Sequence, residues 1–160
     1  SHEVAKLGGK VESLCVDVSE PALQFAKANV ERAGGAVTIL KQDVLENLSM
    51  IPEKQFDIVI ADPPAFIKSK KDIPTGTHAY LKLNTSAFKF VKAGGLVASC
   101  SCSGLFEEEM LKSVVEKSIR RNNRQAQCIS HGGHSADHPV LLGFSEGFYL
   151  KMFIHHLSEE

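Results

Sequence analysis

The sequence predicts a doubly wound α/β fold built on a mostly parallel sheet. Short apolar, β-branched runs alternate along the chain with segments of helical periodicity. Three of these runs end at an aspartate, at positions 17, 43 and 62. Alternation of strands and helices is typical of a parallel sheet whose crossovers are helical.

The first third of the chain is expected to hold two helices and two strands. A helix over residues 2–7, closed by Gly8-Gly9, precedes a strand over residues 11–16 that ends at Asp17. Ser19 is a suitable cap for the next helix, which ends at the glycines at 34 and 35. A second strand over residues 37–40 ends near Asp43.

The rest of the chain continues the alternation. Residues 56–61 are predicted to form a strand, and the polar stretch 68–78, with Pro74 and Gly76, a surface loop. A helix at 80–91 should be stopped by a glycine pair. The remaining predicted elements are a strand at 96–102, a helix at 106–121 with acidic residues first and basic residues last, and strands at 125–129 and 148–156.

Length and composition favour one domain, taken as residues 1–160, with a substantial core, since 43% of the residues are hydrophobic. No apolar run is long enough to span a membrane, and the start lacks a signal-peptide pattern, so a cytoplasmic location is expected. The four cysteines do not form a disulfide pattern, which favours a reducing compartment. The net charge of −1 is low for a domain that grips nucleic acid unaided.

Candidate functional residues gather at the carboxyl ends of the predicted strands, where ligands bind in open α/β sheets. They are Asp17, Asp43, Asp62 and the segment Ser101-Cys102-Ser103-Gly104. A carboxylate accepts two hydrogen bonds at once, so Asp17 suits the hydroxyls of a ribose. Asp43 could accept from an adenine amino group. Together these two acids indicate a cofactor that contains adenosine.

Asp62-Pro63-Pro64 and the cysteines carry more specific chemistry. Two consecutive prolines fix φ and remove two backbone donors. The Asp62 carboxylate and the Pro63 carbonyl are therefore expected to face a cleft and to hold the polar edge of a planar base. Cys102 lies just before a predicted helix N-terminus, which favours a thiolate nucleophile. Cys100 has the same strand parity, and spacing alone does not choose between the two thiols.

These motifs resemble a known family of enzymes. The segment 16–23 is similar to the ribose-binding segment of class I methyltransferases, and Asp43-Val44 to their adenine-contact segment. The strings at 62–66, 101–104, 136–140 and 146–151 resemble those of the bacterial ribosomal large-subunit RNA cytosine-carbon-5 methyltransferases. The resemblance runs over almost the whole chain, and it favours Cys102 over Cys100 because Ser101-Cys102-Ser103-Gly104 is the matching string.

The resemblance implies transfer of a methyl group from S-adenosylmethionine to carbon 5 of cytosine in RNA. Cys102 would attack carbon 6, and Asp62 would hold the ring edge of the cytosine. The implied cofactor-binding residues are Asp17, Val18, Asp43, Val44, Asp62 and Pro63. The implied substrate-binding residues are Pro64, Phe66, Lys68, His138 and Pro139.

The sequence departs from the family in two ways. The first strand with its glycine-rich loop and the N-terminal RNA-binding domain are both missing. The chain is therefore expected to be a fragment of a longer protein that binds cofactor poorly and has little activity alone.

Three alternatives remain open. Asp-Pro-Pro followed by an aromatic residue also serves amino-group methylation of bases, although Ala65 here separates the prolines from Phe66. A cluster of Cys128 and the histidines at 131, 134 and 138 has ligand types that zinc prefers, although their spacing is not that of a standard finger and no bound metal is expected. A non-catalytic oligomerisation module, such as a homodimer formed through the last strand, is the third.

Overall fold

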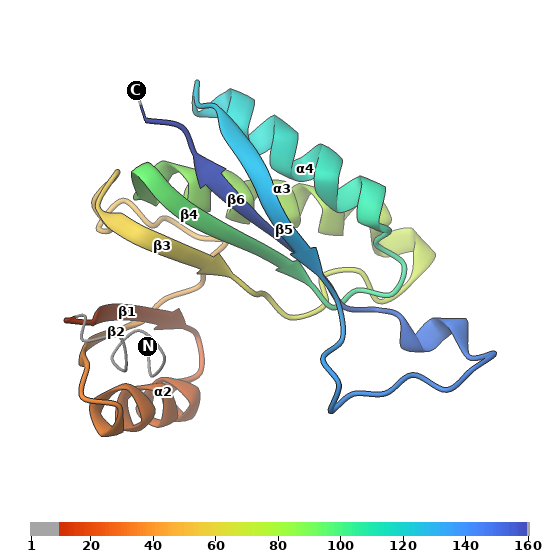
Figure 1. The fold of residues 1–160 in the computed structure, drawn as a ribbon, viewed down its shortest axis with the longest axis horizontal. Helices are drawn as coiled ribbons and strands as arrows, with labels where there is room; N and C mark the ends of the chain where they lie inside the picture. Colours follow the sequence, from red (N-terminus) through yellow and green to blue (C-terminus); the bar gives the residue numbers. More distant parts are fainter. Residues whose placement is uncertain (1–9, 160) are drawn as a thin grey trace. The chain divides into compact units, whose positions relative to one another are not determined.

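The computed structural model describes residues 10–159, which form two compact units divided between Met50 and Ile51 (Figure 1). The helix expected at residues 2–7 lies outside the described residues. No helix in the described part of the chain is long and apolar enough to cross a membrane.

The first unit is a β-α-β arrangement. Its elements are β1 (Glu12–Asp17), α2 (Glu20–Arg32) and β2 (Ala36–Lys41). The two strands are parallel, and Asp17 is aligned with Lys41. The Ser19 hydroxyl accepts from the Ala22 amide at 3.3 Å and caps α2, as expected. After α2, Gly34 adopts a φ of +79°, a left-handed conformation that glycine permits without strain.

The second unit is a four-stranded mixed sheet with two helices packed together against it (Figure 1). Its regular elements are β3 (Phe56–Ala61), α3 (Ile73–Phe90), β4 (Val91–Ser101), α4 (Glu108–Arg121), β5 (Ala126–Gly132) and β6 (Lys151–Leu157). The strand order is β3-β4-β6-β5. The β3–β4 pair is parallel, whereas β6 runs antiparallel to both β4 and β5.

Strict alternation along β4 separates the core from the functional side. Every second residue from Val97 to Ser103 is buried, while the residues between them are half-buried. The buried set faces a core whose fully buried side chains include Tyr80, Phe88, Phe106, Leu111, Val114, Val115 and Leu157. Cys100 and Cys102 therefore share the other face of the strand, as their spacing predicts.

The prediction of a surface loop over residues 68–78 is wrong for most of its length. A 3₁₀ turn, η1 (Lys70–Asp72), leads directly into α3, which begins at Ile73. Pro74 lies in the first helical turn, where its missing amide proton is not needed. Gly76 is buried, and a Cβ there would lie 2.3 Å from Ile67 Cγ1, so the position has no room for a side chain. Both residues thus fit a helix at this place.

The last strand begins later than the predicted 148. A 3₁₀ turn, η2 (Ser145–Gly147), precedes it, and β6 starts at Lys151. Ser101 at the end of β4 pairs with Lys151, so the strand begins where its partner ends. Apolar residues at 148–150 lie outside the ladder although their sequence favours a strand.

Candidate active site

Asp17 and Asp43 follow the two parallel strands of the first unit. They lie at the same edge, since Asp17 is aligned with Lys41 and the Gln42 amide donates to the Asp17 carbonyl at 3.0 Å. Both side chains are exposed. The predicted pairing of these two acids at one strand edge is thus present in this unit.

Each of these carboxylates is oriented by one local hydrogen bond. Oδ1 of Asp17 accepts from the Ser19 amide at 2.7 Å, and Oδ1 of Asp43 accepts from the Leu45 amide at 2.8 Å. Among residues 10–159, the second oxygen of each carboxylate has no hydrogen-bond donor. These orientated, exposed acceptors fit the hydroxyl and amino donors of an adenosine group.

In the second unit, Cys102 lies against the Asp62-Pro63-Pro64 turn. β3 and β4 are parallel neighbours, with Ala61 aligned with Ser99, so both strands deliver their following residues to one edge. The Cys102 thiol donates to the Pro63 carbonyl oxygen at 3.8 Å. Pro63 is buried and Asp62 is exposed. The structure therefore brings together the two motifs that the sequence singled out for chemistry.

Cys100 lies on the same face of β4 but in a different electrostatic setting. Burial, and next the negative charge of Asp62, raise the pKa of its thiol from 9.0 to about 11. Cys100 is therefore a thiol, not a thiolate, at neutral pH. This disfavours Cys100 as a nucleophile.

A buried hydroxyl network surrounds the Cys102 segment, and sequence reasoning missed it. Tyr80 of α3 is fully buried, and its hydroxyl lies 2.9 Å from the hydroxyls of both Ser101 and Ser103. The Tyr80 ring is stacked with Phe106 at 4.4 Å and tilted against Phe66 at 4.9 Å. The alternation of serines around Cys102 was the one available signal, but nothing in the sequence identifies their partner.

Lys151 was also missed as a site residue. Its ammonium donates to the carbonyls of Ser103 at 3.0 Å and Tyr149 at 2.9 Å. Burial lowers the pKa of this amine. Lys151 thereby joins the turn after Cys102 to the segment that enters β6.

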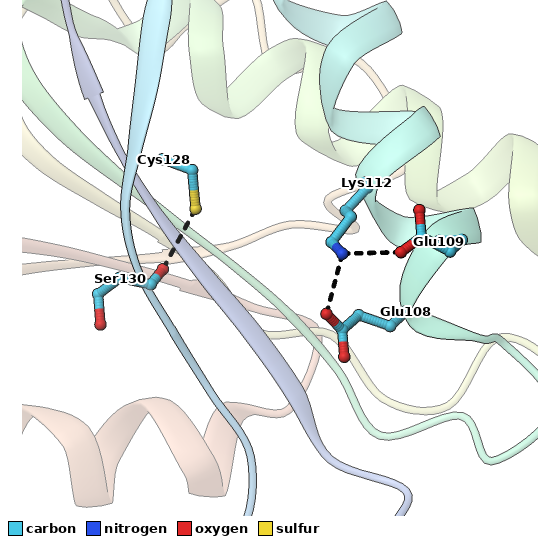
Figure 2. Close-up of polar contacts among 5 residues, drawn as sticks. All are labelled: Glu108, Glu109, Lys112, Cys128 and Ser130. Carbon is cyan, nitrogen blue, oxygen red and sulfur yellow. Dashed lines mark hydrogen bonds and ion pairs between the residues drawn. The ribbon is translucent and has the colours of Figure 1, made fainter.

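A pocket of about 510 Å³ opens beside this turn. Its walls come from the start of α4, the end of β5 and the residues that enter β6. They are Gly104, Glu107, Glu108, His131, Gly132, Gly133, Phe148, Leu150, Lys151, Met152 and Phe153. Phe148 keeps 70% of its surface exposed, so an aromatic face is available to a bound group. Of the wall residues, Glu108 pairs with Lys112 at 3.1 Å, and Lys112 also pairs with Glu109 at 2.7 Å (Figure 2).

The residues predicted to bind substrate are distributed unevenly. Pro64 and Lys68 are exposed near the Asp62 turn, whereas Phe66 is half-buried against Tyr80. His138 and Pro139 are exposed and do not line the pocket. The Nδ1 atom of His138 lies 3.3 Å from Oδ1 of Asp137.

The zinc alternative gains no support from the arrangement of its candidate ligands. Between residues 10 and 159, no three His, Cys, Asp or Glu side chains are grouped so as to hold a metal ion. The Cys128 thiol instead donates to the Ser130 carbonyl at 3.5 Å on the exposed strand β5 (Figure 2).

The comparisons with known proteins define the class. The model of the methyltransferase small domain matches residues 1–127, and the chain belongs to this family. This family and the structural likenesses below confirm the α/β methyltransferase fold class and the prediction of an S-adenosylmethionine-dependent family.

Two similar proteins carry a more specific name than the family does. The chain is 36% identical over 151 residues to ribosomal RNA large subunit methyltransferase I of Photobacterium profundum, covering 91% of this chain and 38% of the relative. It is 31% identical over 158 residues to the protein of the same name from Cronobacter sakazakii, covering 96% and 40%. The chain thus spans less than half the length of these relatives.

Solved structures share the fold. A candidate SAM-dependent methyltransferase from Streptococcus mutans superposes with a TM-score of 0.71 at 19% identity, covering 95% of this chain and 40% of that one. A methyltransferase homologue from Pyrococcus horikoshii gives a TM-score of 0.61 at 18% identity, covering 92% and 53%. At this level of identity, the likeness concerns the fold.

Proposed function

We propose that the protein containing this chain transfers a methyl group from S-adenosylmethionine to carbon 5 of a cytosine in ribosomal RNA. The observation that carries the proposal is the contact between the Cys102 thiol and the Pro63 carbonyl, which joins a nucleophile to the Asp62-Pro63-Pro64 turn. The ribosomal substrate is supported by the names of the relatives. Such a substrate agrees with the expected cytoplasmic location.

In this mechanism Cys102 Sγ, as a thiolate, forms a bond to carbon 6 of the cytosine. The electron pair of the 5,6 double bond makes carbon 5 nucleophilic, and Asp62 holds the polar edge of the ring that takes up the charge. The cofactor supplies the methyl group that carbon 5 receives. A base then removes the carbon 5 proton, the double bond re-forms and the thiolate leaves.

The same proposal names the residues that would bind the cofactor. Asp17 would bind the ribose hydroxyls with Val18 beside them, and Asp43 would accept from the adenine amino group with Val44 beside it. The second oxygen of each carboxylate, which has no hydrogen-bond donor among residues 10–159, supports these roles. Asp62 and Pro63 would present backbone and side-chain acceptors near the reacting methyl group.

The RNA would be held by exposed residues of this chain. Lys68 would contact a phosphate, and the exposed residues Pro64, His138 and Pro139 would contact other parts of the RNA. The ring of Phe66 packs on Tyr80, so its role would be to shape the base site from behind. Since the net charge of this chain is −1, most of the attraction to RNA would come from the rest of the longer protein.

The decisive experiment measures methylation of ribosomal RNA by the full-length protein, with the product nucleoside identified by mass spectrometry. We expect 5-methylcytidine from the wild type, none from Cys102→Ala, and substantial activity from the matched control Cys100→Ala. A methylated exocyclic amino group, with Cys102→Ala fully active, would instead establish the amino-methylation alternative.

A further inference from the structure

We propose that Tyr80 is a positioning residue that holds Cys102 in its attacking orientation. This inference rests on the proposed function, because it concerns the thiol that would attack the cytosine. Tyr80 lies on α3, 22 positions before Cys102, and is shielded from both solvent and substrate, with 0% of its surface exposed. Its influence therefore passes through the residues on either side of Cys102.

Hydrogen bonds close a ring around the backbone of Cys102. The Ser103 amide donates to the Ser101 hydroxyl at 3.2 Å, and the Ser101 hydroxyl donates to the Tyr80 oxygen at 2.9 Å. The Tyr80 oxygen accepts this bond, so its single hydroxyl proton can be donated to the Ser103 hydroxyl oxygen at 2.9 Å. The ring thus satisfies groups that are all at most 1% exposed.

The segment that follows β3 also donates a hydrogen bond to this ring. The Ile67 amide donates to the Ser103 hydroxyl oxygen at 3.2 Å. Ile67 lies four positions after Pro63, whose carbonyl receives the Cys102 thiol. The network therefore fixes β4 relative to the segment that follows β3.

The orientation of Cys102 follows from strand geometry. With both neighbouring serines drawn into the core, the side chain between them must point to the opposite face. That face is the one where the Pro63 carbonyl lies 3.8 Å from the thiol. Loss of the Tyr80 hydroxyl would leave two buried serine hydroxyls without their shared partner and would release this constraint.

Tyr80→Phe removes the Tyr80 hydroxyl and keeps its aromatic ring. Phenylalanine keeps the stacking with Phe106 at 4.4 Å and the tilted contact with Phe66 at 4.9 Å. Ser118→Ala is the matched control. Ser118 has 0% of its surface exposed, and its hydroxyl donates to the Val114 carbonyl at 2.8 Å within α4. This control removes a buried hydroxyl that takes no part in the hydrogen-bonded ring around Cys102.

The assay uses the full-length protein with RNA that carries 5-fluorocytosine. The thiolate adds to carbon 6 and carbon 5 receives the methyl group, but fluorine cannot leave as a cation, so the covalent adduct persists. We expect Tyr80→Phe to slow adduct formation about 10- to 100-fold, as expected for a misplaced nucleophile, with little change in the KM for RNA. Ser118→Ala should form the adduct at the wild-type rate.

A second readout follows the ring itself by amide hydrogen exchange. We expect the Ser103 amide to exchange faster in Tyr80→Phe than in the wild type or in Ser118→Ala. A wild-type adduct rate in Tyr80→Phe would overturn the positioning role. If the wild type forms no adduct, the proposed function fails, and unchanged exchange at Ser103 in Tyr80→Phe would then overturn the ring as well.

Discussion

The raised pKa of Cys100 gives a prediction that needs no substrate. The shift from 9.0 to about 11 lowers its thiolate population about 100-fold at neutral pH. In a Cys102→Ala protein, we expect iodoacetamide to alkylate the half-buried Cys100 at least about tenfold more slowly than the exposed Cys128, because the greater nucleophilicity of a high-pKa thiolate offsets only part of the lost population. Mass spectrometry of the digested protein measures both rates in one sample.

The pH dependence separates ionisation from restricted access. A buried thiol that is merely hard to reach is labelled slowly at every pH, whereas the Cys100 rate should keep rising about tenfold per pH unit up to about pH 10. Asp62→Asn should raise the rate at neutral pH only in part, because burial is the larger cause of the shift. The matched control is Asp57→Asn, which removes an exposed carboxylate of β3 that is paired with Lys92.

Two results would refute this reasoning. Labelling of Cys100 as fast as that of Cys128 would show that the thiol is not held in its neutral form. Equal rates in Asp62→Asn and Asp57→Asn would show that the Asp62 carboxylate does not act on Cys100, and would weaken the placement of Asp62 beside the reacting thiols.

Three further predictions concern stability and can be measured by urea unfolding. Burial lowers the pKa of His155 below its ordinary 6.5, so the unfolded chain takes up the proton first and the free energy of unfolding should fall as the pH drops below about 6.5. His155→Leu should flatten this pH dependence, and an unchanged slope would contradict the prediction. Gly76→Ala places a Cβ 2.3 Å from Ile67 and should lower the free energy of unfolding by about 1–3 kcal/mol. Thr75→Ala, at the exposed neighbouring position, should change it little, and equal effects of the two substitutions would refute the close contact. Ser99→Ala removes a buried hydroxyl that lacks a partner among the described residues and should stabilise the protein by about 1 kcal/mol; a loss of stability would contradict this prediction.

The sequence was sufficient to predict features that depend on local pattern and strand direction. Alternating apolar runs predicted the strands, and the rule that parallel strands share a carboxyl edge predicted that Cys102 and the Asp62 turn would meet. Both hold within the second unit. The same rule placed Asp17 and Asp43 together in the first unit.

Features that depend on contacts between distant residues could not be predicted. Tyr80 meets Ser101 and Ser103 across more than 20 positions, and its sequence setting is that of any amphipathic helix. The start of α3 was missed because Pro74 and Gly76 are usual helix breakers. The direction of β6, which makes the sheet mixed, also left no local signal.

The inward face of β4 has a consequence for engineering this protein. Serines at 99, 101 and 103 occupy core positions that apolar side chains would fill with greater stability. Two of them hold the Cys102 turn, but Ser99 takes no part in that ring. Thermal stabilisation should therefore start at Ser99 and leave Ser101 and Ser103 unchanged, since natural sequences often give up stability where function requires polar groups.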